Sequence, residues 1–209
     1  DVASARARAL TAISHRTAHI VIASASALLP RVSSPDRVRH ASRELVVGGL
    51  VSPTELGDLL ADAGFMPEDP VDEHGEFCVR GGVVDFFPVG DEYPVRVEFV
   101  GDLIEGLRCY DPGTQRSIES LDRATVIPLR EVFESVSSDD RGPNRWQLVR
   151  DASVLDYMAS LPRLRVFVIE ADECAERADK VMSQVSASYA EATTRGESVP
   201  MPEQLLIDW

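Results

Sequence analysis

"GEFCVRGGVVDFFPVGDEYPVRVEFVGD", residues Gly75–Asp102, carries most of the strand signal in this chain of 209 residues. In "VRVEFV" (95–100) apolar and polar side chains alternate, which is the period of a strand with one buried face. The double glycine Gly81–Gly82 interrupts the first half, and we expect a β-bulge there. "GD" then turns the chain into a third strand. Short strands joined by tight turns predict an antiparallel sheet.

A helix is predicted directly upstream, over residues 53–63. Ser52 is a good N-cap, and Pro53 occupies the first helical position, where its missing N–H costs nothing. Glu55 follows Ser52 by three residues and can complete a capping box, while Gly64 is placed to end the helix. The helix and the strands that follow it predict a compact α+β module.

Segments of α/β character flank this module. "AHIVIAS" (18–24) and "RVFVIEADE" (165–173) are apolar runs rich in β-branched residues, and we expect both to be buried strands. Residues 2–14 and 174–192 favour helices. The predicted fold class is therefore α/β with an inserted antiparallel α+β domain. The predicted boundaries are 1–48 for the first α/β part, 49–129 for the insert and 130–209 for the return segment.

Charge and cysteine usage exclude several classes of function. The formal net charge of −14 argues against free-standing nucleic-acid binding, which needs clustered basic residues. Residues 1–51 nevertheless hold seven arginines against three acids, so a DNA contact through that part stays an alternative. Cys78, Cys109 and Cys174 lack the close spacing of a zinc site. We expect them to be reduced and the protein to be cytoplasmic.

No motif for catalysis is complete. The pattern GxxxxGK[ST] of a phosphate-binding loop is absent, as is GxSxG. "VFVIEADE" is similar to the strand that positions a magnesium-binding acid, but Asp172 and Glu173 also suit the start of a helix. We therefore expect no catalytic residue, metal or cofactor in this chain, and an interaction module rather than an enzyme. Since the sequence begins on Asp1 inside a helical pattern, we expect a piece of a longer protein, and a nucleotide-binding half that needs an upstream segment stays an alternative.

The stretch His74–Ser117 resembles the N-terminal UvrB-homology region of the bacterial transcription-repair coupling factor, Mfd. The shared pattern runs through "GEFCVRGGVVDFFP", "EYPVRVEFVGDLI" and "DPGTQRS", in order and with matching spacing. UvrB itself has this architecture and is the alternative, but it usually reads "DPLTG" where this chain has "DPGTQRS". The resemblance implies a partial RecA-like (UvrB-like) α/β domain that carries the insert.

The resemblance also implies a function. In both families the inserted domain docks UvrA, the damage-recognition ATPase of nucleotide excision repair. The coupling factor is an ATP-dependent DNA translocase that displaces stalled RNA polymerase and then recruits UvrA. Its contacts with RNA polymerase and double-stranded DNA, its ATP and magnesium, and its autoinhibitory C-terminal domain belong to regions outside this chain.

Three positions correspond to the contacts that the family makes with UvrA. Arg80 and Arg96 match the two arginines, and Val100 stands where the family has an aromatic residue. The substitution of valine reduces the apolar part of the expected contact. An alternative stays open, because each arginine could instead pair with a local acid, such as Asp85 or Glu98, and only close the face of the sheet.

Overall fold

The computed structural model describes residues 2–136 and 146–209, which group into two compact units. Unit 1 comprises the chain up to Thr11 together with Arg37–Glu131, and unit 2 comprises Ala12–Asp36 and Val132–Trp209. The fold class is mixed α/β with an antiparallel-rich sheet, as predicted at that level. The boundaries at 48 and 129 stay predictions.

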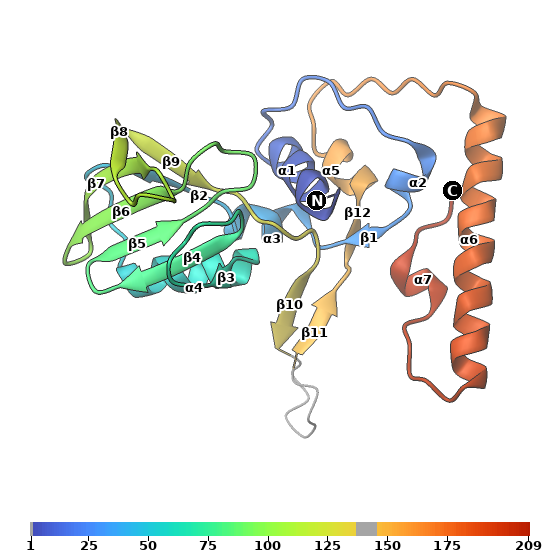
Figure 1. The fold of residues 1–209 in the computed structure, drawn as a ribbon. Helices are drawn as coiled ribbons and strands as arrows, with labels where there is room; N and C mark the ends of the chain where they lie inside the picture. The colour runs from blue at the N-terminus through green and yellow to red at the C-terminus, as the bar shows by residue number, and fades with distance from the viewer. Residues whose placement is uncertain (1, 137–145) are drawn as a thin grey trace. The chain divides into compact units, whose positions relative to one another are not determined.

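The centre of unit 1 is a six-stranded sheet in the order β3-β4-β5-β6-β7-β8 (Figure 1). Only β3 and β4 run parallel, and the other neighbours are antiparallel. The strands are β3 (Met66–Pro67), β4 (Glu76–Arg80), β5 (Val83–Phe86), β6 (Val95–Val100), β7 (Leu103–Tyr110) and β8 (Ser117–Leu121). A separate antiparallel pair joins β2 (Arg43–Val46) to β9 (Arg123–Val126).

Helix α4 (Pro53–Ala63) has the predicted bounds and caps. The backbone N–H of Glu55 donates to the Ser52 hydroxyl over 3.1 Å, and Gly64 ends the helix in the left-handed conformation with φ of 101°. The return half of the predicted capping box is replaced by an ion pair, since the Glu55 carboxylate accepts from Arg43 at 2.6 Å.

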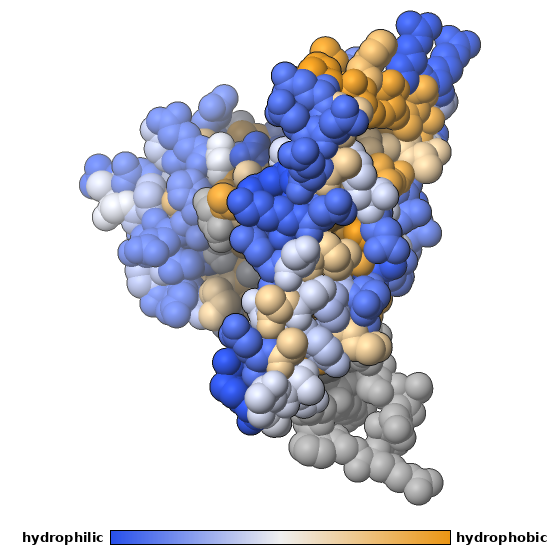
Figure 2. Space-filling view, turned by 90° about the vertical axis from the view of Figure 1, so that its right-hand side faces the viewer, coloured by the Kyte–Doolittle hydropathy of each residue, from blue (hydrophilic) through white to orange (hydrophobic). Residues whose placement is uncertain are grey.

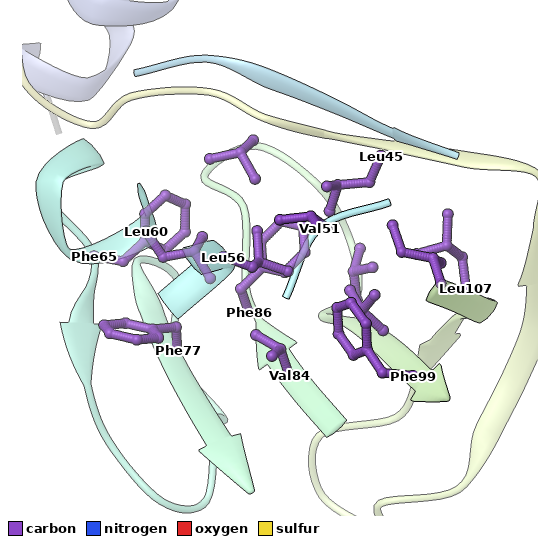
Figure 3. Packing of buried hydrophobic residues seen from close by; sticks show 14 of the residues in the cluster. Leu45, Val51, Leu56, Leu60, Phe65, Phe77, Val84, Phe86, Phe99 and Leu107 are labelled. Atoms are coloured by element: carbon purple, nitrogen blue, oxygen red, sulfur yellow. The ribbon is translucent and has the colours of Figure 1, made fainter. Parts of the chain in front are cut away.

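One core cluster holds unit 1 together (Figure 3). Leu56 and Leu60 of α4 pack against Phe77, Val84 and Phe86 of the sheet, and all five side chains are buried. The β2–β9 pair contributes Leu45 and Val126 to the same cluster. Helix and strand pair therefore cover one face of the sheet, and the other face is left without this cover.

The predicted bulge at Gly81–Gly82 is wrong. These glycines form the two-residue turn of a hairpin, because Arg80 and Val83 are directly paired across it and Gly81 has φ of 59°. A Gly-Gly loop suits this turn since neither residue carries a side chain that opposes positive φ. A register shift occurs instead on β7, where Glu98 pairs with Gly106 but Phe99 pairs with Ile104.

Unit 2 is built from short elements and one long helix. The elements that lie wholly within it are α2 (Ala25–Leu28), β1 (Arg31–Val32), β10 (Phe133–Val136), β11 (Trp146–Val149), β12 (Ala152–Ser153), α5 (Val154–Ala159), α6 (Ala171–Thr194) and α7 (Pro202–Leu205). Both strand pairs, β1–β12 and β10–β11, are antiparallel. Two further helices, α1 (Val2–Ser14) and α3 (Pro35–His40), span the points where the chain passes from one unit to the other.

Hydrogen bonds and a small cluster hold unit 2 together. Ser33 accepts from the backbone N–H of Phe133 and donates to the carbonyl of Val149, and its own carbonyl accepts from the Tyr157 hydroxyl over 2.6 Å. Leu29, Ala178 and Leu206 form a buried apolar cluster between α2, α6 and α7. The hydrogen bonds of Ser33 join parts of the chain that are 100 or more residues apart, so unit 2 is assembled from two distant segments.

The two predicted buried strands, 18–24 and 165–173, are both wrong in this structure. Residues 18–24 have no regular structure, and residues 165–169 also run as coil before α6 begins at Ala171. Their apolar side chains are exposed: Ile22 is 94% and Phe167 84% accessible. A strand needs a neighbour for its backbone hydrogen bonds, and no described strand pairs with either segment. The apolar composition indicated burial but not the surface that would provide it.

Both segments line one open groove in unit 2, together with Leu161, Leu164 and Trp209. In Figure 1 the segment that leads into α6 runs along the top of the view. Figure 2, turned about the vertical axis, shows hydrophobic surface in the upper part of the molecule. None of the helices in the part of the chain that the structure describes has the length and apolar character of a membrane span.

Gly64→Ala tests the end of α4. An L-residue in the left-handed region is disfavoured, and a Cβ at this position would lie 2.7 Å from Nε of Arg130. We expect the free energy of unfolding to fall by about 1–2 kcal/mol, measured by urea denaturation. Gly113→Ala is the control, because its Cβ would meet only Asp111 at 3.4 Å. An equal loss of unfolding free energy in both variants would contradict the conclusion that Gly64 ends α4 in a conformation that requires glycine.

Candidate functional site

The outer face is the side of the six-stranded sheet turned away from the core cluster. Directly paired residues share a face of a sheet, so the pairing places Cys78, Asp85, Arg96 and Arg108 in one row across β4, β5, β6 and β7. The next row contains Arg80 and Val83. The face on which Arg80 and Arg96 were predicted to lie is therefore the outer face.

Asp85 is at the centre of this face and yet is fully buried, with 0% exposure. Arg96 binds it through two hydrogen bonds of 2.8 Å, one from Nε to Oδ1 and one from Nη2 to Oδ2. Arg80 adds a third, from Nη2 to Oδ2 over 2.6 Å. The two guanidinium groups satisfy this carboxylate by charge-assisted hydrogen bonds.

Further contacts fix Arg96 in one orientation. Its Nη2 donates to the side-chain oxygen of Gln115 over 3.1 Å, and its guanidinium lies 4.4 Å from the ring centroid of Tyr110. Tyr110 is buried and donates from its hydroxyl to the carbonyl of Val71. Burial raises the pKa of the Tyr110 phenol, so it stays a neutral donor. The hydrogen bonds with Asp85 raise the pKa of Arg96.

Exposure distinguishes the two predicted arginines. The side chain of Arg80 is 43% exposed and that of Arg96 only 19%. Arg80 also pairs with the exposed carboxylate of Asp69 at 3.0 Å. Each arginine therefore pairs with a local acid, as the alternative predicts. The side chain of Arg80 is nevertheless partly accessible to solvent, and the contact role of both arginines stays a prediction.

Val100 lies on the same strand and the same face as Arg96, and it is 59% exposed. The structure thus gathers all three predicted site residues on the outer face. Sequence reasoning did not identify Gln115 and Tyr110 as supports of Arg96. One signal was present: "DPGTQRS" contains Gln115, which adopts a positive φ of 59° as it turns its side chain to this cluster.

A third arginine shares the outer face. Arg108 pairs with Glu98 across β6 and β7 at 2.6 Å, and a Cβ on Gly106 would lie 3.3 Å from the same carboxylate. The side chain of Arg108 is 39% exposed. Each of the three arginines is thus paired with a carboxylate: Asp85 is buried, whereas Asp69 and Glu98 are partly exposed. Guanidinium groups bind carboxylates in a planar, two-pronged geometry.

The part of the chain that forms the outer face is similar to known proteins. The family described as the UvrB interaction domain matches residues 44–132, which include every strand of the outer face. Over residues 44–132 the chain is therefore similar to a UvrB interaction domain. The predicted resemblance to transcription-repair coupling factors is confirmed by relatives that carry this name.

The chain is 34% identical to the transcription-repair-coupling factor of Bacillus subtilis (strain 168) over 61% of its length, and 30% identical to that of Escherichia coli (strain K12) over 70%. It is 29% identical to the UvrABC system protein B of Kosmotoga olearia over 62% of its length. The chain spans only 11% of the first relative and 13% of the second.

Truncation of each arginine tests how much Asp85 depends on it. Arg96→Ala removes two of its three hydrogen bonds and should lower the free energy of unfolding by about 2–3 kcal/mol, since a buried charge is left underbonded. Arg80→Ala removes one and should cost about 1 kcal/mol or less, because Arg80 is partly solvated. Urea midpoints with unchanged m-values measure both.

The control is Arg123→Ala, which removes a 71% exposed side chain from its pair with Glu44. Its unfolding midpoint should match that of the unaltered chain. Equal losses for Arg80→Ala and Arg96→Ala would show that the pairing with Asp85 does not determine the stability of this face.

Proposed function

We propose that this chain is the docking module through which a transcription-repair coupling factor recruits UvrA in nucleotide excision repair. The observation that carries the proposal is the outer face itself: a UvrB interaction domain presents Arg80 and Arg96 there around one buried carboxylate. The relatives share this region with UvrB, and UvrB-type proteins are the alternative parent. The proposed docking through the outer face is the same whether the parent is a coupling factor or a UvrB-type protein.

The geometry supports binding to an acidic protein surface. Arg96 is held by Asp85, Gln115 and Tyr110, so little side-chain freedom remains to be lost when a partner binds. The side chain of Arg80 is 43% exposed, so a partner carboxylate could reach it in competition with Asp69. Residues 76–131 hold eleven acids against six arginines, and a local group of guanidiniums in this acidic domain gives the partner a distinct target.

We also propose that unit 2 is part of a RecA-like α/β domain. The support is the pair of apolar segments around Ile22 and Phe167, which have strand-like sequences, lie exposed and line one groove. Further strands of such a domain would cover them. In the longer protein, ATP and magnesium, RNA polymerase, double-stranded DNA and an autoinhibitory C-terminal domain would engage regions other than this chain.

Binding to purified UvrA tests the docking proposal. Arg80→Glu should weaken binding by about 30-fold or more, because it places a carboxylate where a partner carboxylate would bind. Isothermal titration calorimetry measures the affinity, and circular dichroism checks the fold. Arg123→Glu, on β9 and outside the outer face, is the matched control and should bind normally. Normal binding by Arg80→Glu would place the docking surface elsewhere.

Nucleotide binding by this chain is a separate question. With no complete phosphate-binding loop in the sequence, we expect no ATP turnover and no rise in melting temperature with Mg-ATP. Thermal unfolding at increasing Mg-ATP concentration measures this. A melting temperature that climbs with the nucleotide concentration would support the alternative of a nucleotide-binding half-domain.

A further inference from the structure

The register shift on β7 reverses which side chains face the core. Leu107 is buried opposite Val97, so strict alternation would turn Glu105 and Leu103 inward as well. Glu105 instead is the unpaired extra residue of a bulge, since Glu98 pairs with Gly106 and Phe99 with Ile104. Beyond the bulge Ile104 is 2% exposed and Leu103 is 41% exposed. The bulge therefore places a leucine on the outer face.

Leu103 lies between two other exposed apolar side chains. Val100 is its direct partner across the β6–β7 hairpin, and Leu50 is paired with it on the other side by an isolated bridge. The hydrogen bonds Val51 N to Asp102 O and Ile104 N to Gly49 O, both 2.9 Å, flank that bridge. Leu50 is 73% and Val100 is 59% exposed. We call Leu50, Leu103 and Val100 the apolar row.

The apolar row lies on the same face as Arg80 and Arg96. Val100 is on the outward side of β6 together with Arg96 and Glu98, and the backbone N–H of Phe99 beside it donates to Gly82 of the turn that follows Arg80. An isolated exposed apolar side chain on a protein surface needs no explanation. Two leucines and a valine in one row, on the same face as ion-paired arginines, resemble the apolar centre of a protein interface.

We propose that the apolar row is the hydrophobic half of the UvrA-docking surface, and that Leu50 and Leu103 supply contact area that Val100 alone does not. The inference rests on the proposed function. Its partner surface would carry an apolar side chain that covers the row, flanked by carboxylates that reach Arg80 and Arg96. The row lies within the residues that match the UvrB interaction domain and shares the outer face with Arg80 and Arg96, so the occupant we infer is UvrA. A second copy of this chain, with its net charge of −14, would be repelled.

The test compares four forms of the 209-residue chain for binding to purified UvrA by calorimetry: unaltered, Leu50→Ser, Leu103→Ser and the matched control Leu155→Ser. Leu155 is a similarly exposed leucine, at 47%, on α5 of unit 2. Each substitution in the row should weaken binding about tenfold, because a buried interface leucine is truncated, and the control should bind as the unaltered chain does. Melting temperatures verify that each form is folded.

Salt separates the apolar contribution from the charged one. The loss in Leu103→Ser should persist at high salt, whereas the loss in Arg80→Glu should shrink as the charges are screened. If Leu50→Ser and Leu103→Ser bind normally while Arg80→Glu does not, docking through the outer face stands and the apolar row is refuted. If the unaltered chain does not bind UvrA, the proposed function fails and this inference fails with it.

Discussion

The buried carboxylate of Asp85 is the constraint on which the outer face depends. A carboxylate without access to water is stable only when its oxygens are hydrogen-bonded, and here Arg80 and Arg96 provide those bonds. The arginines are in turn restricted to the positions from which they can reach it. One acidic residue thus couples the stability of the sheet to the geometry of its exposed surface. The sequence leaves the structural and the contact roles of these arginines as alternatives, but one arrangement of the two side chains is compatible with both roles.

The elements of unit 1 were predictable because their signals are local. Ser52, Pro53 and Gly64 define both ends of α4, and alternation along residues 95–100 assigns the two faces of β6. The bulge was misplaced because Gly81–Gly82 signals either a bulge or a turn, and only the pairing of Arg80 with Val83 decides. The bulge at Glu105 lies beside Gly106, and a glycine inside a strand pattern is a local signal of a bulge. That signal does not decide which neighbouring residue is the unpaired one, and so the outward position of Leu103 follows only from the pairing.

The candidate site was predictable only in part. The resemblance identified Arg80, Arg96 and Val100, and the alternation placed Arg96 and Val100 on one side of β6. That Asp85 would be the shared partner of both arginines depends on strand register, which the sequence leaves open between Asp85 and Glu98. In unit 2, segments 18–24 and 165–169 show the limit of apolar composition as a signal, because it indicates a preference for burial without naming the neighbour that satisfies it.

The antiparallel pairing of β2 with β9 has a consequence for the order of folding. Ser33 and Phe133 of unit 2 are 100 residues apart in the chain, so their contact closes a long and entropically costly loop. Once Arg43 is held opposite Val126, the free chain between Ser33 and Phe133 falls to fewer than about twenty residues. Loop-closure entropy then favours the contact by roughly 1.5 kcal/mol. The pairing of β2 with β9 in unit 1 therefore brings the two segments of unit 2 close together, and we expect unit 2 to assemble after unit 1 has folded.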